Sequence, residues 1–120
     1  MESILIVDDD INLCNFLSDE LNAIGYEARY LTDGESAVEF LKENNPDLIL
    51  LDLNMPGKNG FDVQKEISNI PGFKSKVIVL TAQSDVKSAI VCAQLGASDF
   101  LCKPYDLTEL LSTINKVNHK

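Results

Sequence analysis

The stretch Ile4–Asp10, with the sequence ILIVDDD, joins four apolar residues directly to three carboxylates. An uninterrupted apolar run is typical of a strand that is covered on both faces, as in a parallel sheet. The acids lie where this strand would end, although like charges this close repel and uncharged Gly, Asn or Ser could form a turn there. The stretch therefore predicts an inner strand, and it indicates that the acids at its carboxyl end have a chemical function rather than a role in forming the turn.

Four more segments have the character of strands, and helical patterns lie between them. Leu48–Leu51 and Val77–Leu80 are apolar throughout, which predicts inner strands. Glu27–Leu31 and Asp99–Cys102 mix polar with apolar residues, which suits the edges of a sheet. One more helix is expected after Gly60, and the other helical stripes comprise Leu13, Phe16, Leu17, Leu21 and Ile24; Ala37, Phe40 and Leu41; Val86, Ala89, Ile90 and Ala93; and Leu107, Leu110, Leu111, Ile114 and Val117.

The alternation of strands and helices predicts an α/β fold. Right-handed crossovers give a doubly wound (βα)5 arrangement, with a five-stranded parallel sheet in the order 2-1-3-4-5 and helices on both faces. Ligands of such sheets bind beyond the carboxyl ends of the first and third strands. Gly25 and Gly96 stand where helices would end, and Thr32-x-x-Glu35 resembles a capping box.

Length, composition and charge limit the classes of protein. The 120 residues suit one domain, 1–120, and 45% hydrophobic with 24% charged residues is typical of a soluble globular chain. No apolar run approaches the roughly 18 residues of a membrane span, and we expect a cytoplasmic protein. Cys14, Cys92 and Cys102 lack the spacing of a zinc site or disulfide framework. The net charge of −9 argues against direct contact with nucleic acid by this domain.

Polar groups follow or end the predicted strands at one edge of the sheet. Asp8 and Asp9 follow the first, Asp52 the third, Thr81 the fourth and Lys103 the fifth. Neighbouring strands lie ~4.8 Å apart, so these groups should converge. The acids suit Mg²⁺, and the metal with Lys103 would form a positive clamp for a phosphoryl group. Asp52, in the middle, is the best candidate for a nucleophile that forms an acyl phosphate, whereas Asp10 is expected to begin a helix.

Over its whole length the chain resembles the chemotaxis-regulator-like receiver domain of two-component response regulators. The matching motifs are VDD at Val7–Asp9, DLNMPGKNG at Asp52–Gly60, TA at Thr81–Ala82 and KP at Lys103–Pro104. The resemblance implies a phosphorylation-driven switch, not an enzyme with external substrates. It implies phosphoryl transfer from a sensor histidine kinase or phosphotransfer protein, and an output domain or partner protein. A phosphorylation-dependent homodimer is among the arrangements it allows.

The resemblance also implies roles for individual residues. Asp52 would be the phosphoacceptor, and Mg²⁺ would be held by Asp9, Asp52 and the Asn54 backbone carbonyl, with Asp8 acting through water. Lys103 would contact Asp52 and then a phosphoryl oxygen, and Thr81 would bind another phosphoryl oxygen and draw the following loop inward. Pro104 would follow a cis peptide bond.

Five further positions have roles that the residues alone do not decide. Phe100 falls at the family's switch aromatic but lacks the hydroxyl of Tyr, and it could equally pack an edge strand. Tyr105 is expected to pack rather than to take part in chemistry. Asn54 and Gln83 stand where the family varies acyl-phosphate lifetime, and His119 is expected to face solvent.

Three other functions share features with this sequence. A phosphatase of the haloacid dehalogenase type also uses a strand-end Asp and Mg²⁺, but it would need a second Asp where this chain has Asn54. A flavodoxin-like electron carrier would offer hydroxyls and amides to a flavin phosphate, whereas three acids repel it. A receiver-like interaction module that is never phosphorylated would have no use for the complete set of chemical groups.

Overall fold

The computed structural model describes residues 2–82 and 85–118 and consists of a five-stranded sheet with five helices. The strands pair in parallel in the order β2-β1-β3-β4-β5, which confirms the fold predicted from the sequence. The strands are β1 (Ser3–Val7), β2 (Glu27–Leu31), β3 (Leu48–Asp52), β4 (Lys76–Ala82) and β5 (Asp99–Lys103). The helices are α1 (Ile11–Ala23), α2 (Gly34–Glu43), α3 (Gly60–Ile67), α4 (Val86–Gln94) and α5 (Leu107–Asn118).

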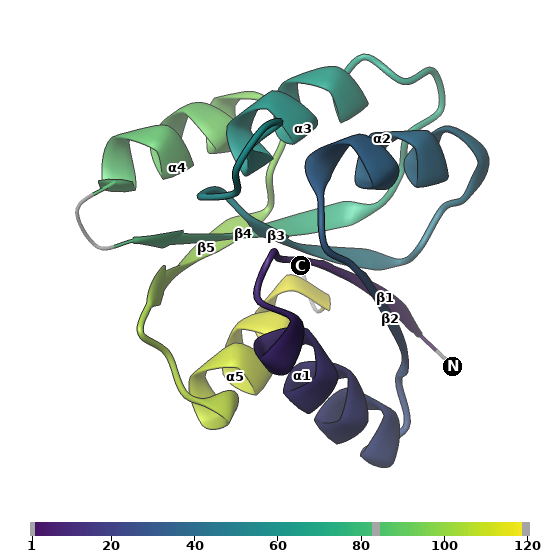
Figure 1. The fold of residues 1–120 in the computed structure, drawn as a ribbon, viewed down its shortest axis with the longest axis vertical. Helices are drawn as coiled ribbons and strands as arrows, with labels where there is room; N and C mark the ends of the chain where they lie inside the picture. Colours follow the sequence, from purple (N-terminus) through teal and green to yellow (C-terminus); the bar gives the residue numbers. More distant parts are fainter. Residues whose placement is uncertain (1, 83–84, 119–120) are drawn as a thin grey trace.

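The helices cover both faces of the sheet (Figure 1), with α1 and α5 on one face and α2, α3 and α4 on the other. Because side chains alternate along a strand, each inner strand contributes to two separate cores. Ile4 and Ile6 of β1 pack with α1 and α5, whereas Leu5 and Val7 pack on the opposite face with α2 and α3. All five residues of β3 are buried, which explains the uninterrupted apolar run in the sequence.

Two of the predicted helical stripes were partly wrong. Phe16 and Ile24 on the α1 side are 51% and 56% exposed, and Ile90 of α4 is 53% exposed. The buried face of α1 instead consists of Cys14, Leu17, Ser18 and Leu21, and that of α4 of Ala89 and Cys92. The prediction counted only aliphatic and aromatic residues. It therefore missed Cys14 and Cys92, and it missed Ser18, whose hydroxyl donates to the Asn15 carbonyl within the helix. The stripe predicted for α5 was right at Leu110, Ile114 and Val117, which are buried.

Four of the five helices begin with a capping side chain. The side chains of Asp10, Asp33 and Asn59 accept hydrogen bonds from backbone N–H groups in the first turns of α1, α2 and α3. The capping box predicted at Thr32 and Glu35 was therefore wrong by one residue, because Asp33 is the cap. A reciprocal box occurs at α5, where Asp106 accepts from the Glu109 N–H and Glu109 accepts from the Asp106 N–H.

The helix ends follow the sequence more closely. Gly25 and Gly96 lie just beyond α1 and α4 with φ of 107° and 108°, a left-handed conformation that favours glycine. In the part of the chain that the structure describes, no helix is long and apolar enough to cross a membrane.

Candidate functional site

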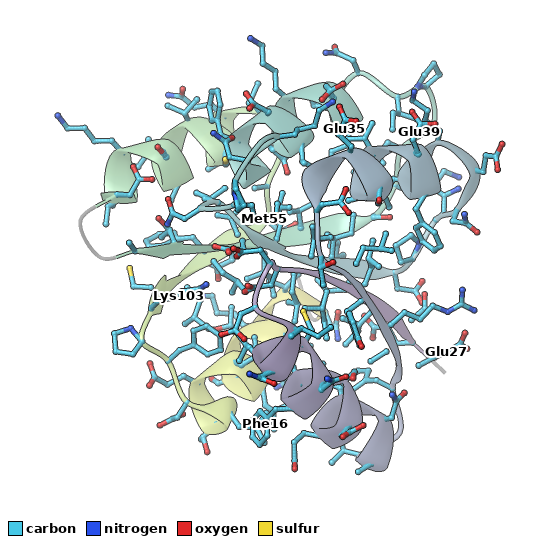
Figure 2. The ribbon with its side chains drawn as sticks, viewed as in Figure 1. Phe16, Glu27, Glu35, Glu39, Met55 and Lys103 are labelled. Carbon is cyan, nitrogen blue, oxygen red and sulfur yellow. The ribbon has the colours of Figure 1, made fainter. Side chains whose placement is uncertain are left out.

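The candidate site lies at the carboxyl edge of the sheet, where four neighbouring strands end. Asp8 directly follows β1, while Asp52 and Lys103 are the last residues of β3 and β5. Thr81 lies inside β4, one residue before its end, and not after the strand as the sequence suggested. Figure 2 shows the Lys103 side chain at this edge of the sheet, on the side of the molecule where the loop bearing Met55 also lies.

Asp8, Asp52 and Lys103 form a compact charged group. The Lys103 Nζ lies 3.3 Å from an oxygen of Asp8 and 3.3 Å from an oxygen of Asp52. The two carboxylates are almost fully buried, whereas the Lys103 side chain is about one-third exposed. One ammonium therefore compensates two carboxylates, which leaves a net negative charge in a poorly hydrated place.

Backbone N–H groups hold both buried carboxylates. The Asp10 N–H donates to Asp8 at 3.0 Å, and the Asn54 N–H donates to Asp52 at 3.1 Å. Each bond runs from an N–H group two residues further along the chain. The turns after β1 and β3 thus orient the acids before any ligand arrives.

The pKa values of Asp52 and Lys103 reflect burial together with the excess of negative charge. Burial raises the pKa of Asp52, the Asn54 N–H lowers it, the charge of Asp8 raises it and Lys103 lowers it, and the resulting pKa is about 6. Burial by itself would lower the pKa of Lys103, but the carboxylates of Asp52 and Asp8 outweigh burial and raise it. Lys103 therefore remains an ammonium at neutral pH, while Asp52 gains or loses its proton in mildly acidic solution.

Asp9 completes a cluster of three acids. Asp8, Asp9 and Asp52 each place one oxygen within 4.8 Å of the others, and Asp9 is exposed where the other two are buried. The set consists of oxygen ligands only and is open to solvent on one side, which fits Mg²⁺ with several retained waters. Asn54, also exposed, is held next to the cluster by its bond to Asp52.

Thr81 is fully buried, and its hydroxyl is engaged by backbone. It lies 3.2 Å from the carbonyl oxygen of Ala82 and 3.1 Å from that of Asp85, to which it can donate. Asp85 precedes α4, so this hydroxyl connects β4 to the beginning of that helix. Sequence reasoning missed this partner because a backbone carbonyl has no residue signature.

The remaining predicted residues surround the charged group. Phe100 is 41% exposed on the edge strand, and Tyr105 packs partly buried against the α1–α5 core, as expected of a packing residue. The Lys103–Pro104 bond is cis. Gln83 and His119 lie outside the described residues.

Two features of the site, a hydrogen bond and a cavity, were not predicted. The Cys14 thiol donates to the Asp8 carbonyl at 3.3 Å, and burial together with nearby acids raises its pKa to about 12. Such a thiol remains protonated and supports the strand end without being reactive. A cavity of about 400 Å³ lies beside Lys103 and is lined by Asp10, Leu13, Ala82, Lys103, Pro104 and Tyr105.

Comparisons with known proteins agree with this geometry. The family model for the response regulator receiver domain matches residues 4–115. The chain is 34% identical to the DNA-binding response regulator MtrA of Mycolicibacterium paratuberculosis over 113 residues, which is 94% of this chain and 49% of that protein. The chain thus spans about half the length of the curated relatives it matches.

Two solved structures have the same fold. The response regulator TrrA of Thermotoga maritima, in complex with Mg²⁺-BeF, has a TM-score of 0.84 and 33% identity and covers 98% of this chain and 99% of its own. The non-phosphorylated HemR receiver domain of Leptospira biflexa has a TM-score of 0.87 and 31% identity, covering 98% and 94%. These matches exclude the phosphatase and flavin-carrier alternatives. The chain belongs to the family of response regulator receiver domains, which act as signalling switches.

Proposed function

We propose that residues 1–120 form a single receiver unit in which Asp52 accepts a phosphoryl group from a histidine kinase or phosphotransfer protein. One observation carries the assignment: the Lys103 ammonium lies 3.3 Å from an oxygen of Asp52 and from an oxygen of Asp8. Because β3 lies between β1 and β5 in the sheet, Asp52 lies between the acids that follow β1 and the Lys103 ammonium at the end of β5. A nucleophile in this position can form a bond to phosphorus while positive charge stabilises the phosphoryl oxygens.

The proposed step transfers a phosphoryl group from nitrogen to oxygen. An oxygen of Asp52 forms a bond to phosphorus as the bond from phosphorus to the donor imidazole breaks. The donor histidine keeps the electron pair of that bond and takes up a proton from solvent. The Lys103 Nζ stabilises negative charge on a phosphoryl oxygen.

We further propose that the site uses Mg²⁺, held by Asp9, Asp52 and the carbonyl of Asn54, with Asp8 acting through water. The bound ion would neutralise phosphoryl charge that Lys103 alone cannot balance. The all-oxygen acid cluster supports this, as does the Mg²⁺-BeF complex of the relative TrrA. Asp9 and Asn54 are the exposed members and would meet the ion from the solvent side.

The switch would follow from the position of Thr81. Its hydroxyl is near the Asp85 carbonyl, and a phosphoryl group on the neighbouring strand would offer it a charged acceptor instead. Transfer of this hydrogen bond would release the beginning of α4. Phe100, exposed on β5 and paired in register with Val79 of β4, could respond to that movement.

The relatives suggest which partners this receiver has and how its signal is passed on, and we state both as proposals. MtrA is described as DNA-binding, and this chain matches about half of it. With a net charge of −9, the receiver is unsuited to DNA contact, so we propose that an output domain or partner protein makes it. A homodimer formed on phosphorylation is one way to transmit the signal. We also propose that the protein is cytoplasmic.

Phosphorylation can be tested by intact mass after incubation with a small acyl-phosphate donor and Mg²⁺. We expect the wild type to gain one phosphoryl group and Asp52→Asn, which is nearly isosteric, to gain none. Equal phosphorylation of both proteins would refute the assignment of Asp52. No phosphorylation of the wild type would favour the receiver-like module that is never phosphorylated.

The metal site can be tested by thermal unfolding. A close pair of like charges costs up to about 4 kcal/mol at an effective dielectric near 20, and Lys103 offsets part of this. Asp9→Asn removes one charge and one ligand, so without metal it should be more stable than wild type by about 1 kcal/mol. Mg²⁺ should raise the melting temperature of wild type saturably and that of Asp9→Asn little. Destabilisation of Asp9→Asn without metal would instead mean that Asp9 has a structural role.

A further inference from the structure

Gly34, the first residue of α2, has no room for a side chain. A Cβ at this position would collide with the backbone carbonyl oxygen of Lys58 and would lie 2.9 Å from Cγ2 of Val63. Its backbone does not have a positive φ, so conformational freedom is not the reason for glycine here. Alanine is also the better helix former. The requirement for glycine at residue 34 therefore comes from the close approach of Lys58.

Lys58 belongs to the loop 53–59, which connects β3 to α3 and carries Asn54. The beginning of this loop is fixed, since the Leu53 N–H donates to the Leu80 carbonyl at 2.9 Å. Its end is fixed by Asn59, which caps α3, and by the ion pair between Lys58 and Glu66. Contact with Gly34, at the beginning of α2, adds a fourth support.

Gly60 gives the loop a similar support at its other side. A Cβ on Gly60 would collide with the Asp52 carbonyl oxygen and lie 2.7 Å from the Leu53 Cα. The first residues of α2 and α3 are thus both glycines pressed against the backbone of the segment 52–58. Gly60 belongs to the motif that begins at Asp52, whereas Gly34 is 18 residues before Asp52 in the sequence.

We propose that Gly34 is a positioning residue for the phosphoacceptor site. It lets α2 lie against the Lys58 carbonyl and so fixes the loop that places the Asn54 N–H on Asp52. The carbonyl of the same residue is the ligand proposed for Mg²⁺. The proposal rests on the proposed function, because it assigns the loop a role in holding Mg²⁺. A Cβ at residue 34 would push the loop outward and move the Asn54 carbonyl while leaving the three acids in place.

The test compares Gly34→Ala with Val63→Ala. Val63 is fully buried and touches the same region, but its truncation leaves the Lys58 carbonyl undisturbed, so it reports on packing alone. For each protein, the Mg²⁺ concentration at half-maximal thermal stabilisation is measured together with the rate of phosphorylation by a small acyl-phosphate donor at limiting and saturating Mg²⁺.

We expect Gly34→Ala to need about tenfold more Mg²⁺, as is typical when support of a metal ligand is lost. Its phosphorylation should be slow at limiting Mg²⁺ and recover at saturating Mg²⁺. Val63→Ala should lower the melting temperature while its Mg²⁺ requirement stays that of wild type. A Gly34→Ala protein with the wild-type Mg²⁺ requirement, or an equal shift in Val63→Ala, would overturn the proposal and leave the phosphoacceptor function intact.

A second measurement on the wild type keeps the proposal testable if Gly34→Ala does not fold. During a Mg²⁺ titration followed by nuclear magnetic resonance, the Gly34 amide should shift with the same midpoint as the Asn54 amide, although Gly34 carries no metal ligand. A Gly34 amide that does not respond while Asn54 does would refute the coupling. If neither amide responds and the wild type is not phosphorylated, the proposed function itself fails, and the role of Gly34 fails with it.

Discussion

The beginnings of α2 and α4 share a sequence pattern but differ in structure. Asp33 and Ser36 begin α2, and Asp85 and Ser88 begin α4 with the same spacing. Asp33 accepts both the N–H and the hydroxyl of Ser36, at 2.7 and 2.9 Å. Asp85 accepts the Ser88 hydroxyl at 2.7 Å, and within the described residues its side chain caps no N–H of α4.

The backbone explains the difference. Asp33 is extended, with φ −148° and ψ 157°, the conformation of a helix cap, whereas Asp85 has φ −120° and ψ 36°. The Asp85 carbonyl lies 3.1 Å from the Thr81 hydroxyl, a partner that Asp33 does not have. One helix start is thus completed by its own side chain, and the other is connected to the candidate phosphorylation site. In α4 only Ala89 and Cys92 are buried, fewer residues than in any of the other four helices, so we expect α4 to be displaced more easily than they are.

Thr81→Ala tests the connection most directly. The variant should still be phosphorylated, because the hydroxyl is neither the nucleophile nor a metal ligand. In the wild type, phosphorylation should change amide exchange in α4 and around Phe100 by about tenfold, within the usual range for coupled sites, and leave α2 unchanged. In the variant the α4 response should be lost. Identical exchange changes in the two phosphorylated proteins would mean that Thr81 does not couple the site to α4.

The pH dependence of stability tests the charge at the site itself. Because the pKa of Asp52 is raised from 3.8 to about 6, the native state holds a proton that the unfolded chain has released. The resulting stability is fully present below about pH 4 and is lost as the pH rises to about 6. At 1.36 kcal/mol per pKa unit the loss is at most about 3 kcal/mol, and we expect about 1 to 2 because Asp8 and Lys103 share the proton equilibrium.

Urea unfolding without Mg²⁺ measures this loss as the difference between wild type and Asp52→Asn across pH 4 to 7. The loss of stability should affect the whole domain, so amide hydrogen exchange should change equally in α2 and α4. The effect of Thr81→Ala, in contrast, should be confined to α4 and the surroundings of Phe100. A difference that does not change with pH would show that burial does not raise the pKa of Asp52.

These regions also show what a sequence can reveal about such a site. Asp8, Asp52 and Lys103 were predicted together because parallel strands end at one edge, so topology alone makes distant residues neighbours. The Asp85 carbonyl and the space beside Gly34 could not be predicted. Both depend on backbone positions of segments far apart in the chain, and neither requires a distinctive residue type.

The predicted faces of α1 and α4 and the predicted cap of α2 were wrong for a local reason. Exposed Phe16 and Ile90 share their spacing with core residues, so periodicity could not separate them. At α2, Thr32 and Asp33 are both good capping residues, and only the backbone conformation decides between them.

A matched pair of substitutions measures how much the first residues of α2 and α4 contribute to stability as helix caps. Asp33→Ala should lower the free energy of unfolding by about 1 kcal/mol, because it leaves the Ser36 N–H without its partner. Asp85→Ala should stay within the roughly 0.5 kcal/mol of an ordinary surface substitution, since its side chain caps no described N–H. Urea unfolding in metal-free buffer gives both values. Equal losses would show that Asp85 caps α4 in solution.

The smallest expected effect is also the most specific. Ser88→Ala removes the hydroxyl that donates to the Asp85 carboxylate. While Thr81 holds the Asp85 carbonyl, we expect the carboxylate still to make no hydrogen bond to the N–H groups of α4. Combined with Thr81→Ala, the same change should let Asp85 become extended and cap α4 as Asp33 caps α2. A double-mutant cycle should therefore show a favourable coupling of about 0.5 kcal/mol between Thr81→Ala and Ser88→Ala.

Ser36→Ala is the control for this cycle. It brings the same gain in helix propensity, and the Asp33 cap on the N–H of residue 36 remains, so its effect should add to that of Thr81→Ala without coupling. If the Ser88 cycle is additive as well, something other than Thr81 keeps Asp85 from capping. The start of α4 would then be incomplete whether or not the site is phosphorylated. A coupling confined to Ser88 would mean that Thr81 keeps α4 uncapped, and that its removal is enough to give α4 the start that α2 already has.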